Sequence, residues 1–135
     1  MTDFGHWQCN IPIIDGAIGF IYCISNNLDG RKYIGRKLLR FRVSKSPLKG
    51  RTNRRRSTKE SDFKTYTGSC NELNDDIEKF GKENFSFNIL CFCESKSRLS
   101  YMEAKYIIDA DAIFSDAYYN LYLQLRLRGP AKNKK

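Results

Sequence analysis

The feature that most constrains the fold is a pair of short apolar runs joined by a tight-turn sequence. The run from Ile18 to Ser25 is rich in β-branched and aromatic residues, which predicts a strand. It is followed by NNLDG, whose Asp-Gly ending is a strong signal for a β-hairpin, and Lys32 to Arg36 then forms the return strand. Across such an antiparallel ladder Tyr22 and Tyr33 can lie near one another, so the hairpin presents two phenols together.

The rest of the chain carries helix and strand signals in turn. The expected elements are a helix over 69–81, a strand over 84–95, a helix over 97–113 and a strand with alternating leucines over 118–129. In the first helix we expect Ser69 and Glu72 to form a capping box and Gly81 to end the helix. In the strand that follows, the residues expected to alternate toward the core are Phe85, Phe87, Ile89, Cys91 and Cys93.

A chain of 135 residues is long enough for one compact α/β domain with a real core. We divide it into an irregular or strand-like lead-in over 1–17, a domain over 18–123 that includes a basic loop over 45–64, and a strand end with a basic tail over 124–135.

Positive charge is concentrated in one segment. The chain has 24 Lys and Arg against 15 Asp and Glu, a net charge of +9, and fourteen of these cations lie between Arg31 and Lys64 with only two acids. The middle of this segment has turn formers and few apolar residues, so we expect a long mobile loop that grips phosphates. Nucleic acid is the favoured partner over a membrane surface.

Without a spanning stretch or a signal pattern, we expect a cytoplasmic protein, in the host cytoplasm if phage-encoded.

Common catalytic motifs do not occur in the sequence. It contains no GxxxxGK[ST] loop, no HExxH and no CxxC, and its single histidine, His6, is expected to be structural. The five cysteines are expected to be free thiols. Glu103 is the most interesting acid because apolar residues surround it in the predicted helix. Either it needs a buried partner such as a cation or a metal ion, or it completes a capping box with Ser100.

Several short motifs occur in a telling order. They are FIY at 20–22, YIG at 33–35, a basic segment, a block from Gly68 to the FGKENF ending at Phe85, a helix with Glu103, and YYNL at 118–121. This order resembles the GIY-YIG endonuclease family over about 18–123. The stretch ESDFKTYTGS is similar to phage-type members, which are often compared with free-standing homing endonucleases.

The resemblance implies a small α+β sandwich with a central three-stranded antiparallel sheet flanked by helices. It implies hydrolysis of phosphodiester bonds in double-stranded DNA with Mg²⁺, or Mn²⁺, as cofactor. Carried onto this chain, Tyr22 or Tyr33 orients or deprotonates the attacking water, Glu103 binds the metal, and Asn120 ties the site together. Gly35 allows close backbone approach. Because a phenol acts as a base only when its pKa falls from about 10, we expect the cations after Tyr33 to lower it.

The position of the catalytic arginine is left open by the segment RKLLRFR, which could form a short helix. We favour Arg40 over Arg36 and Arg42, with Lys37 as a second phosphate contact, and we expect Tyr66 in the region of a histidine that many members of the family carry. The full set of expected DNA contacts is Arg36, Lys37, Arg42, Lys49, Arg51, Arg54, Arg55 and Arg56.

The alternative functions are a non-catalytic DNA-binding module with the same fold, and a restriction-type or structure-specific nuclease of the same family. An RNA-directed protein ranks last because the chain lacks the aromatic signature of single-strand RNA modules. Cutting both strands with one site requires either two protomers or two sequential nicks, and the final strand could pair between two copies to form a homodimer.

Overall fold

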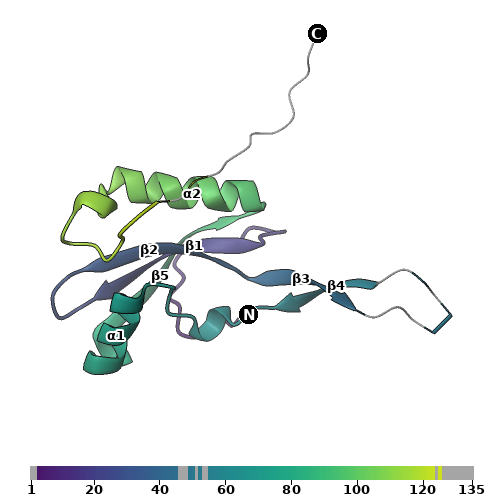
Figure 1. The fold of residues 1–135 in the computed structure, drawn as a ribbon, viewed down its shortest axis with the longest axis horizontal. Helices are drawn as coiled ribbons and strands as arrows, with labels where there is room; N and C mark the ends of the chain where they lie inside the picture. The colour runs from purple at the N-terminus through teal and green to yellow at the C-terminus, as the bar shows by residue number, and fades with distance from the viewer. Residues whose placement is uncertain (1–2, 46–48, 51, 53–54, 124, 126–135) are drawn as a thin grey trace, which may run out of the picture.

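A three-stranded antiparallel sheet forms the centre of the computed structural model, which describes residues 3–45, 49–50, 52, 55–123 and 125. Its strands are β1 (Gly19–Asn26), β2 (Lys32–Leu38) and β5 (Phe85–Cys93), in the order β2-β1-β5 (Figure 1). The Asp-Gly turn joins β1 to β2 as predicted, and β2 runs two residues beyond the expected strand because Leu38 still pairs with Gly19. The sheet expected from the family resemblance is therefore present.

A second, separate sheet of two strands follows β2. Strands β3 (Arg40–Lys45) and β4 (Arg55–Glu60) pair in antiparallel fashion from Arg40 opposite Glu60 to Lys45 opposite Arg55. The prediction of a loop throughout 45–64 is wrong, and so is the short helix considered for RKLLRFR. Both segments satisfy their backbone hydrogen bonds in strand pairing, which polar composition alone does not reveal.

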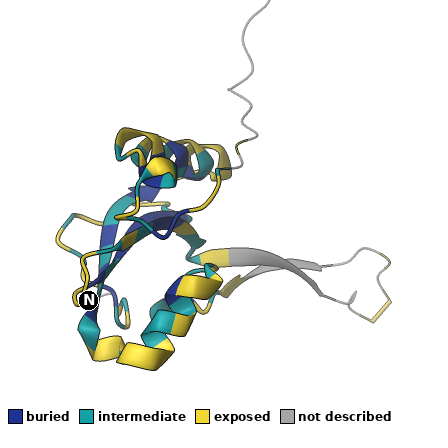
Figure 2. Ribbon diagram, turned by 60° about the vertical axis from the view of Figure 1, so that its left-hand side comes forward, coloured by how far each residue is buried: buried dark blue, intermediate teal, exposed yellow. Residues whose placement is uncertain are grey.

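The two helices cover opposite faces of the central sheet (Figure 1). Helix α1 (Asn71–Phe80) places Leu73 in the cluster that contains Phe20, Tyr22 and Phe87. Helix α2 (Lys96–Asp109) places Leu99 and Ile107 in a second cluster with Ile21 and Ile34. Figure 2 shows the buried strands lying between helices whose outer faces are exposed. Three short 3-10 helices complete the described elements: η1 (Phe63–Thr65), η2 (Lys82–Asn84) and η3 (Ala112–Phe114).

The start of α1 differs from the prediction. Its N-cap residue is Cys70 with no side-chain cap, so the expected Ser69–Glu72 capping box is wrong. Ser69 instead lies beside the Tyr33 hydroxyl, and Glu72 forms an ion pair with Arg31. The end of α1 is as predicted, since Gly81 adopts a φ of 92° and donates its N–H to the Ile77 carbonyl.

The strict alternation predicted for β5 is interrupted. The pairing with β1 shifts between Ile21 and Tyr22, so that Tyr22 pairs with Ile89 while Ile21 pairs with Cys91. The extra residue in β5 reverses the side-chain pattern, as a β-bulge does. As a result Phe92 joins the core on the α1 side and Cys93 the core on the α2 side.

The segment after α2 is not the predicted strand. From Tyr118 to Leu123 it makes one isolated bridge, from Tyr118 to Lys32, and Leu121 is 70% exposed. Apart from position 125, the expected continuation over 124–135 lies outside the described residues. All five cysteines are free, as predicted. Among the described residues, no helix has the length and apolar character needed to cross a membrane.

Candidate active site

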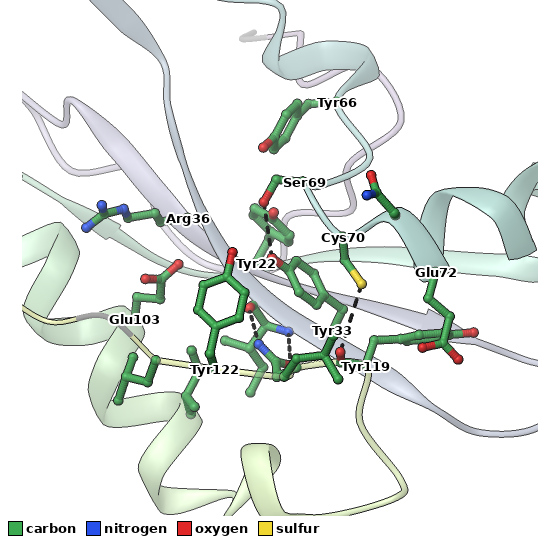
Figure 3. A pocket seen from close by; sticks show the side chains of 16 residues that line it. Tyr22, Tyr33, Arg36, Tyr66, Ser69, Cys70, Glu72, Glu103, Tyr119 and Tyr122 are labelled. Atoms are coloured by element: carbon green, nitrogen blue, oxygen red, sulfur yellow. Dashed lines mark hydrogen bonds between the residues drawn. The ribbon is translucent and has the colours of Figure 1, made fainter.

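A cavity of about 480 Å³ opens beside β2, where side chains from both faces of the sheet meet. Figure 3 shows its lining, which combines phenols, the carboxylates of Glu72 and Glu103, and a guanidinium. The residues used below are Tyr22, Tyr33, Arg36, Tyr66, Glu103 and Asn120. Five of them were predicted as site residues, and the fold brings them together from β1, β2, α2 and the segment that follows α2.

The Tyr22 phenol is almost fully buried, with 1% of the residue exposed, yet its hydroxyl reaches the cavity (Figure 3). Tyr22 pairs with Gly35 across the ladder, and a Cβ atom on Gly35 would overlap the Tyr22 hydroxyl. A Cβ on Gly68, where φ is +85°, would lie 3.3 Å from the same hydroxyl. The two glycines therefore make the room in which this phenol sits.

Two further tyrosines surround Tyr22. Tyr33 is its diagonal neighbour on the hairpin, with ring centroids 6.2 Å apart, as the register predicts. Its hydroxyl lies 3.4 Å from the Ser69 Oγ. The ring of Tyr66 packs edge-on against Tyr22, with ring centroids 6.1 Å apart.

Burial sets the acid–base properties of these phenols. Loss of hydration raises the pKa of Tyr22 well above 10, and the nearby Tyr33 and Tyr66 raise it further. Burial also raises the pKa of Tyr33. The expectation that the cation-rich segment would lower these pKa values is wrong for the protein by itself. Much of that segment continues into β3 and β4, away from the phenols (Figure 1).

Glu103 projects from α2 into the cavity and is half-buried (Figure 3). Burial raises the pKa of its carboxyl, and the charge and the backbone N–H of Arg36 oppose that rise. The capping alternative does not hold, because α2 begins with Ser95 as its cap and Ser100 lies within the helix. The Ser100 hydroxyl instead accepts a hydrogen bond from Arg36.

The cations expected to contact DNA occupy different places. Arg36 lines the cavity, whereas the favoured Arg40 is the first residue of β3 and is not part of the lining. Lys37 forms an ion pair of 2.6 Å with Asp62 and lies 4.0 Å from the centroid of the Tyr66 ring.

The other expected contacts lie along the second sheet or outside the description. Arg42 is in β3, Arg55 and Arg56 are in β4, and Lys49 is exposed in a turn. Arg51 and Arg54 fall outside the described residues.

Asn120 closes the edge of β2 with a two-way amide contact. Its Nδ2 donates to the Ile34 carbonyl at 2.9 Å, and its Oδ1 accepts from the Ile34 N–H at 3.1 Å. The side chain is 5% exposed, so both hydrogen bonds are buried. The amide therefore holds the segment after α2 against the edge of β2.

Sequence reasoning missed the network that supports this contact. The Tyr119 hydroxyl donates to Asp76 at 2.7 Å and accepts from Asn26 at 3.0 Å. The Arg31 guanidinium lies 4.2 Å from the centroid of the Tyr119 ring and forms ion pairs with Asp76 and Glu72. In the sequence, only the tyrosine pair in YYNL and the arginine after Asp-Gly point to this network, and neither feature predicts which residues it contacts.

His6 lies outside the cavity lining and packs in the core periphery, where its ring stacks on Phe87 at 4.1 Å.

Of the two carboxylates that line the cavity, Glu72 is paired with Arg31, and Glu103 is the one that suits a hard divalent ion. No group of three or more His, Cys, Asp or Glu side chains that could enclose a metal occurs in the part of the chain that the structure describes. Mg²⁺ binds through one or two carboxylates while keeping several waters, so a single half-buried Glu103 facing an open cavity fits it.

The fold and the cavity define a small α+β domain whose site joins hairpin tyrosines to a helix carboxylate. A family model described as "Putative endonuclease segE, GIY-YIG domain" matches residues 7–123. The chain therefore belongs to the GIY-YIG endonuclease family. Neither the curated proteins nor the solved structures gave a significant match.

Proposed function

We propose that the protein is a divalent-metal-dependent endonuclease that hydrolyses phosphodiester bonds in double-stranded DNA. The single observation that carries this proposal is the meeting of Tyr22, Arg36 and Glu103 around one cavity. A phosphodiester is anionic and gains charge on its oxygens as water attacks, so a site for it needs positive charge and fixed hydrogen-bond donors. The cavity offers both from rigid strands and a helix.

Arg36 is the guanidinium that we assign to the scissile phosphate. It lines the cavity, and its hydrogen bond to Ser100 holds the end of the side chain near Glu103. A guanidinium in a fixed position stabilises a developing oxyanion without reorganising during the reaction. This proposal replaces Arg40, which lies outside the cavity lining.

Glu103 would hold the metal ion. When bound, a divalent ion supplies charge stabilisation to the phosphate oxygens and a more acidic bound water. Burial disfavours the charged form of the Glu103 carboxyl even with Arg36 nearby, so a bound cation would add compensating charge beside it.

The Tyr22 and Tyr33 hydroxyls act as hydrogen-bond donors. Because their pKa values lie above 10, Tyr22 and Tyr33 carry their protons at neutral pH. Their hydroxyls can therefore donate hydrogen bonds that orient the attacking water and a phosphate oxygen. The two glycines beside Tyr22 keep its hydroxyl at a fixed depth in the cavity.

The test is cleavage of supercoiled plasmid by the purified protein with Mg²⁺, Mn²⁺ or Ca²⁺, each compared with a chelator. We expect nicked or linear product with Mg²⁺ or Mn²⁺, loss of cleavage in Glu103→Gln, and normal cleavage in Glu78→Gln, which changes an exposed carboxylate on α1. A protein that binds DNA but never cuts it would support the non-catalytic alternative. A Glu103→Gln variant that cuts normally would overturn the site assignment.

Metal binding has a readout of its own. Mg²⁺ that binds the folded state should raise the thermal midpoint of the wild type and of Glu78→Gln, but not that of Glu103→Gln.

We further propose a homing-type activity, supported by the resemblance of the segment before Ser69 to free-standing phage-type enzymes. Sequencing of the cut ends should then show one preferred site, whereas random ends would contradict this role.

A further inference from the structure

We propose that the β3–β4 hairpin is an arm that enters the major groove of DNA beside the cavity. This inference rests on the proposed DNA substrate and adds how the duplex is held. Its basis is the charge, the shape and the attachment of the hairpin.

The charge of the paired strands is strongly one-sided. Their twelve residues include six cations and a single acid, Glu60, which lies at the base of the hairpin opposite Arg40. The cations are Arg40, Arg42, Lys45, Arg55, Arg56 and Lys59. At the far end of the paired region the backbone register pairs Lys45 with Arg55, two residue types of like charge. Such a pair destabilises the isolated hairpin, and a polyanion placed beside it would relieve the repulsion.

The shape of the hairpin suits one groove of B-form DNA. It is a two-stranded ribbon that forms a sheet of its own and extends away from the central sheet (Figure 1). The major groove is about 12 Å wide and admits a two-stranded ribbon, whereas the minor groove is only about 6 Å wide. In A-form RNA the major groove is deep and narrow, so a double-stranded RNA should be a poor substitute.

The base of the hairpin is firmly attached next to the cavity. The Leu39 N–H donates to the Ile18 carbonyl at 2.8 Å, and the Ser61 N–H donates to the Leu39 carbonyl at 2.9 Å. The Ser61 hydroxyl also donates to the Leu38 carbonyl at 2.5 Å. Just beyond Ser61, Phe63 is buried with 4% exposure in the core that contains Tyr22.

The direction in which the arm leaves the body is therefore tied to the strand that lines the cavity. Six residues of strand span about 20 Å, and successive base pairs are about 3.4 Å apart. An arm of this length would follow the groove for roughly half a turn on one side of the scissile phosphate.

The test measures DNA binding without cleavage, in Ca²⁺, on a random-sequence duplex labelled with a fluorophore. The arm variant is Lys45→Gln/Arg55→Gln/Arg56→Gln. The matched control is Lys79→Gln/Lys96→Gln/Lys105→Gln, which removes the same charge from exposed positions on the two helices. Circular dichroism and the thermal midpoint check that both variants fold.

We expect the arm variant to bind at least about tenfold more weakly than the control. Its plot of log affinity against log salt should be shallower by up to about 2.7, because each lost phosphate contact removes about 0.9. Methyl green, which occupies the major groove, should displace the wild type, and netropsin, which occupies the minor groove, should not. Equal binding by the arm and control variants would overturn the inference, and so would displacement by netropsin alone or equal affinity for double-stranded RNA.

The binding assay and the plasmid assay can fail separately. If the wild type never cuts plasmid but the arm variant loses binding that methyl green can compete, the nuclease proposal fails and the arm stands. If the wild type cuts plasmid and the arm variant binds like its control, the arm fails and the nuclease stands.

Discussion

The Tyr22 hydroxyl occupies the space that any side chain at Gly35 would need. The two residues face one another across the β1–β2 ladder, so the absence of a Cβ at position 35 sets how deep the phenol can reach. We therefore expect Gly35→Ala to push the Tyr22 ring out of place. Overpacking of this kind costs roughly 1–3 kcal/mol of unfolding free energy, and misplacement by about 1 Å can reduce cleavage a hundredfold.

A double-mutant cycle with Tyr22→Leu checks this relationship by urea unfolding. Because the smaller side chain frees the space beside position 35, the double variant should be more stable than the sum of the single effects by about 1 kcal/mol or more. Additive effects would show that Gly35 and Tyr22 do not compete for space.

Replacing Glu103 by Gln should stabilise the protein at neutral pH while it abolishes cleavage. Burial raises the folded pKa of this carboxyl above its unfolded value, so the folded state binds its proton more readily. The protein therefore loses stability as pH rises from the unfolded pKa of this carboxyl through its folded pKa, and the neutral amide of the variant avoids this loss. The thermal midpoint without metal should favour Glu103→Gln at pH 7 and show a smaller gain at pH 4. An equal difference at both pH values would argue against a desolvated carboxylate.

Loss of the Asn120 amide should be costly. Asn120→Ala leaves the Ile34 N–H and carbonyl without their buried partner, and each unsatisfied group costs about 1–3 kcal/mol. We expect urea unfolding to show a loss of about 2–4 kcal/mol together with reduced cleavage. Asn27→Ala is the control, because its hydrogen bonds to Ser86 are exposed and should cost well under 1 kcal/mol.

His6 should make stability depend on pH between about 4 and 6.5. Burial, together with the charge of Lys82, lowers its pKa to about 4. The unfolded chain, in which a histidine titrates near 6.5, binds the proton more readily than the folded chain does. The stability contributed by the buried, neutral His6 ring is thus complete above the unfolded pKa and is lost as pH falls toward about 4. His6→Phe, which keeps an aromatic ring against Phe87, should remove this part of the pH dependence. The same loss of stability in both proteins between pH 6.5 and 4.5 would contradict it.

The parts of the fold that sequence predicted are those with local signals. The Asp-Gly turn predicted the β1–β2 hairpin and hence that Tyr22 and Tyr33 can lie near one another, and the register shows them to be diagonal neighbours. The position of Glu103 beside them needed the family resemblance, since nothing local shows where α2 packs. The ion-pair and ring contacts of Arg31 join residues more than forty positions apart, and no periodicity encodes them.

Two of the wrong predictions depended on tertiary contacts, which composition and local pattern do not show. The segment over 45–64 lacks apolar alternation, so the pairing of β4 with β3 left no trace that a hydrophobic pattern could show. The direction of the tyrosine pKa shifts depended on burial, which comes partly from Trp7 in a lead-in that was assigned no role. Its ring packs 4.9 Å from that of Tyr22 and contributes to the desolvation that outweighs distant charge.

Both edges of the central sheet are partly covered by segments from outside it. Along β2, the Tyr119 N–H donates to the Lys32 carbonyl at 2.7 Å, and the Asn120 side-chain amide hydrogen-bonds to the Ile34 N–H and carbonyl. Along β5, Gln8 accepts from the Ile89 N–H at 3.0 Å and donates to the Phe87 carbonyl at 2.7 Å. Exposed strand edges are templates for aggregation. The two flanking segments therefore also keep neighbouring molecules from pairing with the central sheet at these positions.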